Sequence, residues 1–148
     1  MISSDLLQKS IIGKLWSNTA LVAVVNTGSI REYMYQGTDI TYPAIRIEIN
    51  PQIPIGDTDV SRIRFSTVNF TIHILSEQNS SKEAGNISGL VHDALFNKQI
   101  DGTDYNGNSH HKFVRIDEII VGNPIRLLER VWEIKANYQA QVSALTNL

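Results

Sequence analysis

The segment from Leu128 to Val142 constrains the fold more than any other part of the chain. Its even-numbered positions are mostly apolar and include Trp132 and Tyr138, whereas its odd-numbered positions are mostly charged or amide side chains. Only Arg130 and Val131 break this alternation. A period of two with one apolar face predicts a half-buried antiparallel strand, with the two aromatic rings packed against the layer that covers it.

The predicted strand is longer than the domain that would contain it. At about 3.3 Å per residue, a straight strand of this length runs about 50 Å. A compact domain of this size spans only about 40 Å. The strand must therefore bend, or it must extend beyond the domain and meet another molecule.

The composition excludes several classes of protein. The 148 residues, 42% of them hydrophobic, fit one domain covering positions 1–148. A net charge of −2 does not indicate nucleic-acid binding, and the absence of cysteine removes disulfides and thiolate metal sites. The longest apolar run, Ala20–Val25, is too short to cross a bilayer, and Asp5 and Gln8 interrupt any signal-peptide core. We expect a soluble protein made in the cytoplasm, with no membrane partner.

Two amphipathic helices are predicted, with a short helix between Asn18 and Val25. Ser3 or Ser4 can cap the first, whose core stripe is Leu7, Ile11 and Leu15. The second follows Ser80-Ser81-Lys82-Glu83, which has the form of a capping box with Ser80 as the cap. Its apolar stripe is Ala84, Ile87, Val91, Ala94 and Leu95. Gly85 and Gly89 are expected to allow the second helix to approach the sheet closely.

Further strands are predicted on both sides of the second helix. Ile30–Tyr35 is a short candidate, and Tyr42-Pro43 opens a strand that ends before Pro51 and Pro54. Ser61–Leu75 is long, and its apolar phase switches near Ser66 or Thr67, which predicts a bulge or a bend. On this strand, His73 is interpreted as a solvated residue of the polar face.

The remaining strands complete the fold class. Gln99–His111 is predicted to be a polar loop, and Lys112–Val121 a third long strand. Asn123-Pro124 is expected to turn the chain into the strand from Leu128. This order predicts an α+β fold: a mainly antiparallel twisted sheet with two helices packed on one face.

No constellation of residues indicates an enzyme. His110 and His111 are neighbours on a strand and point to opposite faces, so they do not converge on a metal. Asp117 and Glu118 face apart for the same reason, which makes them a poor acid–base pair. Phosphate-binding glycine loops and the G-x-S-x-G pattern do not occur. We expect no catalytic residue, no metal and no cofactor.

The segment from Tyr42 to Val142 resembles the tail terminator, or tail completion, proteins of tailed phages, which act at the head–tail junction. The resemblance lies in the order of parts: Tyr42-Pro43-Ala44-Ile45-Arg46-Ile47, then Phe70-Thr71-Ile72-His73-Ile74-Leu75-Ser76, a helix ending Leu90-Val91-His92-Asp93-Ala94-Leu95, a strand around Val114-Arg115-Ile116, and a long strand rich in Arg, Trp and Tyr. The chain departs from common members in the Asn97–His111 insertion and the Pro51–Gly56 loop.

The resemblance implies a structural virion protein without catalytic residues. Members of this family form rings, typically hexameric, that cap the tail tube and join it to the head connector. The implied partners are other copies of the chain, a tail tube protein and a head-completion or connector protein, and DNA passes through the ring without specific binding. The implied location is the neck region of the virion, after assembly in the host cytoplasm. The rival reading is a small-molecule-binding or enzymatic α+β domain with no recognisable motif.

Two sets of residues are predicted to lie on functional surfaces. Ile53 and Ile55 are unusual in a solvated loop, so they either pack under the sheet or contact another subunit, together with Tyr33 and Tyr35. The loops around Asp57, Asp59, Asp101 and Asp104 are candidates either for the channel wall or for faces that meet neighbouring proteins.

Overall fold

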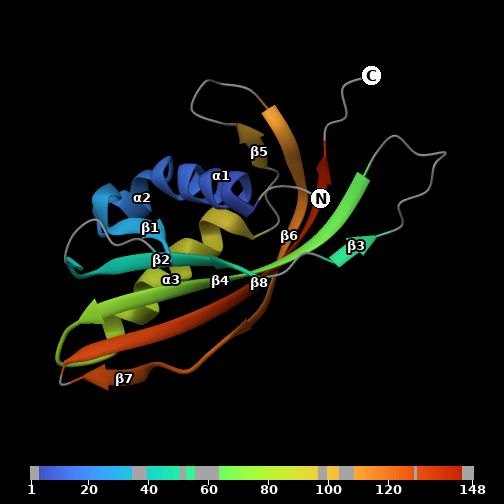
Figure 1. Cartoon of the computed structure of the whole chain (residues 1–148). Helices are drawn as coiled ribbons and strands as arrows, with labels where there is room; N and C mark the ends of the chain where they lie inside the picture. Colours follow the sequence, from blue (N-terminus) through green and yellow to red (C-terminus); the bar gives the residue numbers. More distant parts are fainter. Residues whose placement is uncertain are drawn as a thin grey trace.

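A computed structural model of the chain describes residues 4–34, 40–50, 53–55, 64–96, 100–103, 109–128 and 130–144. In chain order, the elements are α1 (Ser4–Trp16), α2 (Thr19–Val22), a 3-10 turn (Thr27–Ser29), β1 (Ile30–Glu32), β2 (Ala44–Ile49), β3 (Ile53–Ile55), β4 (Arg64–Glu77), α3 (Lys82–Leu95), β5 (Ile100–Thr103), β6 (Ser109–Val121), β7 (Ile125–Leu128) and β8 (Val131–Ala144) (Figure 1).

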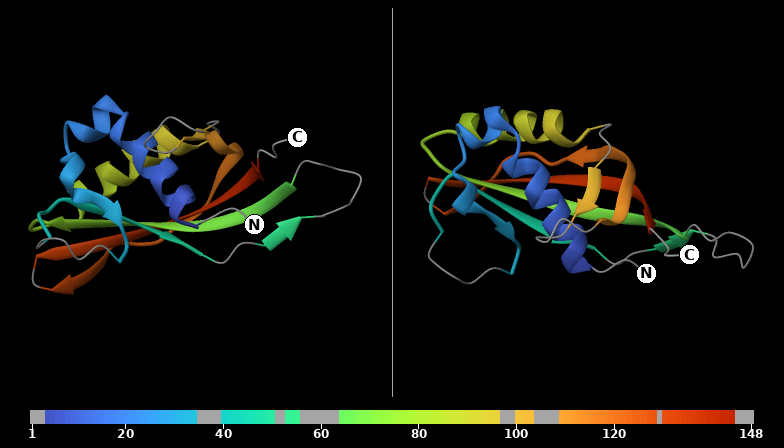
Figure 2. Two further views of the ribbon diagram at one scale, coloured as in Figure 1. Left: turned by 45° about the horizontal axis from the view of Figure 1, so that its top comes forward. Right: turned by 90° about the horizontal axis from the view of Figure 1, so that it is seen from above.

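The strands form one sheet in the order β1-β2-β4-β8-β6-β5. β3 extends the β2 side by pairing with β4, and β7 extends the β6 side by pairing with β8. Every pairing is antiparallel except that of β1 with β2. The helices lie together on one face of this sheet (Figures 1 and 2). The predicted α+β class and mainly antiparallel sheet are confirmed.

The core lies between the helices and the sheet. The predicted stripes of α1 and α3 are buried, as are the even positions of β8 from Ile134 to Val142. Tyr138 is fully buried and stacks on Phe70 of β4 with 5.4 Å between ring centroids. The alternating pattern therefore identified the covered face of the central strand.

The segment from Leu128 to Val142 is two strands rather than one. β7 ends at Leu128, and β8 begins at Val131 after Arg130, whose φ of 79° lies in the left-handed region that suits a reversal. The turn predicted at Asn123-Pro124 is therefore wrong, because the chain reverses after β7. β4 and β8 curve along their length, which is the predicted bend (Figure 2).

A bulge, one of the two alternatives predicted for the Ser61–Leu75 strand, is absent from its pairing with β8. β4 pairs with β8 in unbroken register from Arg64 to Glu77. On its other edge, β4 pairs with β2 as far as Ile49 and Phe70, and with β3 from Ile53 and Thr67. Two predicted loops also contain strands, β3 and β5, and Pro54 is tolerated because β3 is a short edge strand.

Helix α3 does not begin with the predicted capping box. Its N-cap is Ser81, whose side chain makes no capping hydrogen bond. The Glu83 carboxylate accepts from the Ser76 hydroxyl at 2.7 Å, so it anchors the helix to the end of β4. Gly85 and Gly89 lie on the exposed side of α3, where an added Cβ would meet no described atom within 4 Å. The predicted close approach at these glycines is therefore wrong.

Candidate interaction surfaces

A group of exposed aliphatic side chains lies where β6 ends and β7 begins. This group, the β6–β7 patch, consists of Ile119, Ile120, Val121, Ile125 and Leu127. Ile120 is 59% exposed and Ile125 is 54% exposed. Several exposed large apolar side chains at one place in a fold are a candidate contact with another molecule.

The local structure explains why these residues stay exposed. The register of β6 against β8 shifts between Glu118 and Ile120, so the run of three apolar residues spans an irregularity at the end of the strand. β7 then pairs with β8, and no other described strand pairs with it. Its outer edge therefore lacks a neighbour within the described part of the chain, and open edges invite pairing with other chains.

A second group of exposed apolar side chains lies at the opposite edge of the sheet. These residues, the β1 patch, are Tyr33 and Met34. Both directly follow β1, whereas the exposed Ile40 precedes β2 and lies toward the other end of this parallel strand pair. Met34 is 73% exposed, the largest value among the exposed large hydrophobic residues of the described chain.

The two patches lie at the two ends of the same rows of the sheet. Glu32 of β1 and Val121 of β6 are linked across the strands by the successive partners Ile47, Ile72 and Ala136. The first residue lies next to the β1 patch, and the second belongs to the β6–β7 patch. One end of the molecule therefore presents apolar surface at both sheet edges.

Charged residues of both signs lie beside each patch. Arg126 and Arg130 are exposed near the β6–β7 patch, where Glu118 precedes Ile119, and Arg31 and Glu32 are neighbours on β1. Among the described residues, Arg126, Arg130 and Glu32 form no ion pair within the chain.

His73 lies on the sheet face that the helices do not cover, and it is buried rather than solvated as predicted. It is 5% exposed, with Glu48 on one side at 3.7 Å and Glu133 on the other at 3.5 Å. The Tyr33 ring lies over the imidazole with 4.5 Å between centroids. Tyr33 thus covers His73, which explains why the prediction of solvent exposure is wrong.

A second polar cluster joins α3 to the sheet. One Glu118 oxygen accepts from the Tyr138 hydroxyl at 3.0 Å and lies 2.7 Å from Nδ1 of His92. Burial, followed by the negative charges of Glu118 and Asp93, raises the pKa of Tyr138 well above its ordinary value. The tyrosine therefore remains a neutral donor that holds the Glu118 carboxylate in place.

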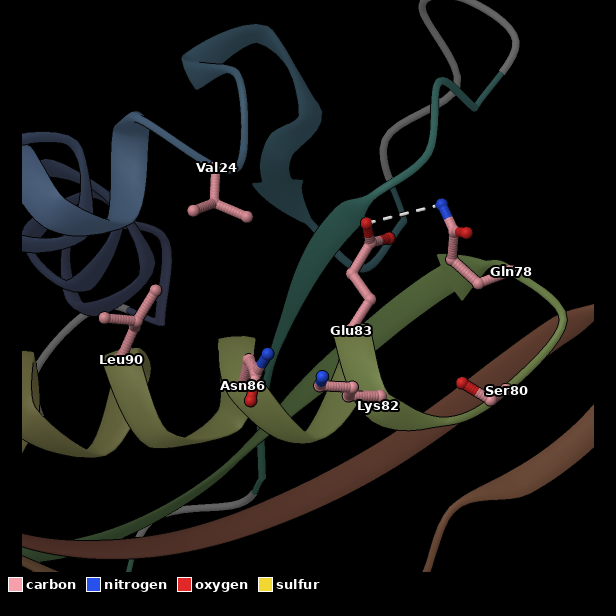
Figure 3. Close-up of a pocket in the computed structure, with 7 residues that line it drawn as sticks. All are labelled: Val24, Gln78, Ser80, Lys82, Glu83, Asn86 and Leu90. Carbon is pink, nitrogen blue, oxygen red and sulfur yellow. Dashed lines mark hydrogen bonds between the residues drawn. The ribbon is translucent and has the colours of Figure 1, made fainter.

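A pocket of about 370 Å³ lies between the start of α3 and the loop after α2 (Figure 3). Its lining is Val24, Gln78, Ser80, Lys82, Glu83, Asn86 and Leu90. Its polar side chains are exposed except for the half-buried Glu83, whose carboxylate accepts from the Gln78 amide at 3.5 Å. Ligand sites generally hold a few polar groups in an apolar, enclosed cavity, and this lining does not have that character.

The structure describes some of the predicted interface residues and not others. Tyr33 is 46% exposed and belongs to the β1 patch. Ile53 and Ile55 lie in β3, and Asp101 lies in β5, where the description is limited to the backbone. Tyr35, Asp57, Asp59 and Asp104 lie outside the described residues.

The β6–β7 patch was missed by the sequence reading, although the sequence carries a signal for it. Three consecutive apolar residues, Ile119 to Val121, cannot all face the core from one regular strand, because neighbouring side chains point to opposite faces. At least one had to be exposed or to lie in an irregularity of the strand.

The described residues offer no candidate for a metal cluster or for a membrane-spanning helix. No group of three or more histidine, cysteine, aspartate or glutamate side chains there could hold a metal ion. No helix in the same residues combines the length and apolar character needed to cross a membrane.

The fold is shared with solved structures of low sequence identity. One is a chain of the virion of a native gene transfer agent particle, which has a TM-score of 0.68 and 15% identity, covering 93% of this chain and 94% of that one. A second, whose name describes no function, has a TM-score of 0.63 and 11% identity, covering 100% and 99% of the two chains. No family model and no curated protein matches the sequence. These comparisons therefore show the fold of the chain, and the same fold occurs in a protein of a gene transfer agent virion.

Proposed function

We propose that this chain is a structural virion protein that assembles with other copies of itself into a ring at the end of a phage-like tail. In this role it caps the tail tube and joins it to the head connector. The observation that carries the proposal is the fold shared over nearly the whole chain with a component of a gene transfer agent virion. The exposed apolar patches at both sheet edges support the self-assembly that a ring requires.

The particular position at the tail end rests on the resemblance of the segment from Tyr42 to Val142 to tail terminator proteins. The polar clusters agree with a role without chemistry. His92, Glu118 and Tyr138 connect a helix to two strands, and their hydrogen bonds satisfy one another rather than an open cavity. The loops that carry Asp57, Asp59, Asp101 and Asp104 are proposed either as the wall of the channel that DNA crosses or as faces that meet neighbouring proteins.

Ile53 and Ile55 are proposed as further subunit contacts. β3 lies on the same side of the sheet as β1, where it extends the edge beyond β2. Replacing both isoleucines by aspartate should leave the fold intact and weaken ring assembly, because the charged side chains would have to be desolvated at the contact. Unchanged assembly and unchanged incorporation into particles would restrict these residues to local packing.

The experiment that tests the proposed function compares particles made with and without this chain. Cells that produce the particles but lack the gene should accumulate filled heads separate from tails, or tails of irregular length, when viewed by electron microscopy. A gene copy carrying Gly89→Ala, a change on the exposed side of α3, serves as the matched control and should restore normal particles. Normal particles in the absence of the chain would refute the proposed function.

A further inference from the structure

We infer that His73 acts as a proton-operated clamp on the face of the sheet that the helices do not cover. When its imidazole carries two protons, Nε2–H donates to Glu48 of β2 and Nδ1–H donates to Glu133 of β8, and the ring of Tyr33 closes over both contacts. Loss of one proton opens one side of the clamp and loosens this cover. The inference concerns a device within the fold and does not depend on the proposed function.

The surroundings of the ring call for two donors. Glu48 lies 3.7 Å from Nε2 and Glu133 lies 3.5 Å from Nδ1, so each ring nitrogen of His73 faces a different carboxylate. Both nitrogens are buried, and neither has a hydrogen-bond partner among the described residues. An ionised carboxylate only accepts hydrogen bonds, whereas a neutral imidazole has one donor and one acceptor nitrogen. Only the protonated imidazolium can therefore donate to both carboxylates.

The two separations lie just beyond hydrogen-bonding distance, which is the geometry of an open clamp. An N–H···O bond between charged partners is about 2.7 to 2.9 Å long, so each carboxylate has to approach by only about 1 Å. Both glutamate side chains are half-buried, so they reach His73 from the rim of the site. A buried polar group without a partner is unfavourable, and closing the clamp removes two of them.

The cations around His73 are directed to other groups. Arg46 and Lys135 are its cross-strand partners on β2 and β8. The Arg46 guanidinium donates to two backbone carbonyl groups, and the Lys135 ammonium lies 3.8 Å from Glu133. Arg31, the next residue of this row on β1, lies over the indole ring at the end of α1. Among the described residues, the two ring nitrogens of His73 therefore meet acceptors and no competing donor.

Tyr33 connects the clamp to the molecular surface. Its ring lies over the imidazole of His73 with 4.5 Å between centroids and a tilt of 32°. Its amide donates to the carbonyl of Ile47 at 2.9 Å, which continues the pairing of β1 with β2 and holds the ring in place. An aromatic face attracts a cation, so protonation strengthens the stacking together with the two hydrogen bonds. A proton on a buried ring is thereby coupled to a side chain that is 46% exposed.

Nitrogen-15 NMR of the imidazole ring tests the clamp in the wild-type protein. Histidine ordinarily changes charge between about pH 5 and 8, so spectra are recorded across this range. In the acid spectra we expect both ring N–H protons of His73 to be visible and protected from exchange with water, because each is buried and hydrogen-bonded. Glu48→Met should remove the protection at Nε2 only, and Glu133→Met should remove it at Nδ1 only, since methionine has a similar length and no carboxylate.

Hydrogen exchange at the Tyr33 amide measures the cover. After correction for the intrinsic exchange rate, its protection should be several-fold greater when His73 is protonated. His73→Gln has no titrating ring and should lose this dependence on pH. His92→Gln is the matched control, because His92 also lies 2.7 Å from a carboxylate but on the helical side of the sheet, and it should keep the wild-type dependence.

The inference is overturned if either ring N–H of protonated His73 exchanges as fast as an exposed imidazole, or if Tyr33 is equally protected at both ends of the pH range. It is also overturned if protection falls on protonation, because repulsion from Arg46 and Lys135 would then govern the ring. These outcomes are read from the wild-type protein, so a loss of folding in a variant does not affect them.

Discussion

Two buried polar clusters lie on opposite faces of the sheet, and each is held by an aromatic residue. On the helical face, Tyr138 donates to Glu118 while stacking on Phe70. On the other face, Tyr33 covers His73 between two carboxylates. Buried polar groups normally require partners. The Tyr138 hydroxyl has one in Glu118, whereas both ring nitrogens of His73 are buried without a hydrogen-bond partner, with the carboxylates of Glu48 and Glu133 at 3.7 and 3.5 Å.

The first prediction concerns the pH dependence of stability at Tyr138. The folded protein raises the pKa of this tyrosine above its ordinary value near 10, so the unfolded chain loses the proton at lower pH than the folded one. The contribution of the phenol to stability is therefore fully present below pH about 10 and declines as the pH rises further. Tyr138→Phe removes this contribution.

The measurement is urea unfolding of both proteins between pH 8 and 11. At neutral pH the variant should be less stable by about 1 kcal/mol, because it loses the hydrogen bond to Glu118. This difference should stay constant to pH about 10 and then shrink, since other titrating groups are common to both proteins. A difference that stays constant up to pH 11 would contradict the raised pKa.

At the scale of elements, the start of α3 depends on β4 rather than on its own sequence. Ser76 is fully buried at the end of β4, and its hydroxyl donates to Glu83 in the first turn of the helix. A hydrogen bond to a charged group contributes more to stability than a neutral one. Ser81, the N-cap residue, makes no side-chain capping hydrogen bond, so the contact between Ser76 and Glu83 is the one that anchors this end of the helix.

The second prediction follows from this contact. Ser76→Ala should lower the free energy of unfolding by about 1 to 2 kcal/mol, whereas Ser80→Ala and Ser81→Ala should each change it by less than about 0.5 kcal/mol. Thermal or urea unfolding of the three variants checks the order. Equal losses at Ser76 and Ser80 would restore the capping box predicted from the sequence.

The sequence predicted the elements whose pattern is periodic and missed those defined by their neighbours. The stripes of α1 and α3 and the alternation of β8 follow from burial on one face. Such burial produces a periodic pattern of apolar residues within the element's own sequence. β3 and β5 are short, and each pairs with the strand that follows it, but Pro54 and a polar composition concealed them. The phase switch near Ser66 left a bulge and a bend as alternatives, and the unbroken register of β4 against β8 excludes a bulge in that pairing.

Tyr33, which was predicted from the sequence as an interface residue, is exposed, whereas the β6–β7 patch was not predicted. The exposure of that patch results from the register shift after Glu118 and from the position of β7 at the edge of the sheet. Both are properties of strand pairing, which a single sequence does not specify. His73 was misread for the same reason, since the ring that covers it comes from another strand.

At the scale of the whole molecule, the charge agrees with a conduit through which DNA slides. The chain has 13 basic and 15 acidic residues, and electrostatic attachment to duplex DNA depends on neutralising phosphates with lysine and arginine. The third prediction is that the purified protein binds duplex DNA only weakly, even at low salt, where attraction is strongest. A salt-sensitive dissociation constant in the micromolar range would contradict a passive conduit.

The most direct test of the central claim is a cryo-electron microscopy reconstruction of the neck of particles from cells that carry this gene. We predict a closed ring of copies of this chain at the end of the tail tube. Particles that contain no copy of the chain, or copies located away from the tail end, would contradict the account.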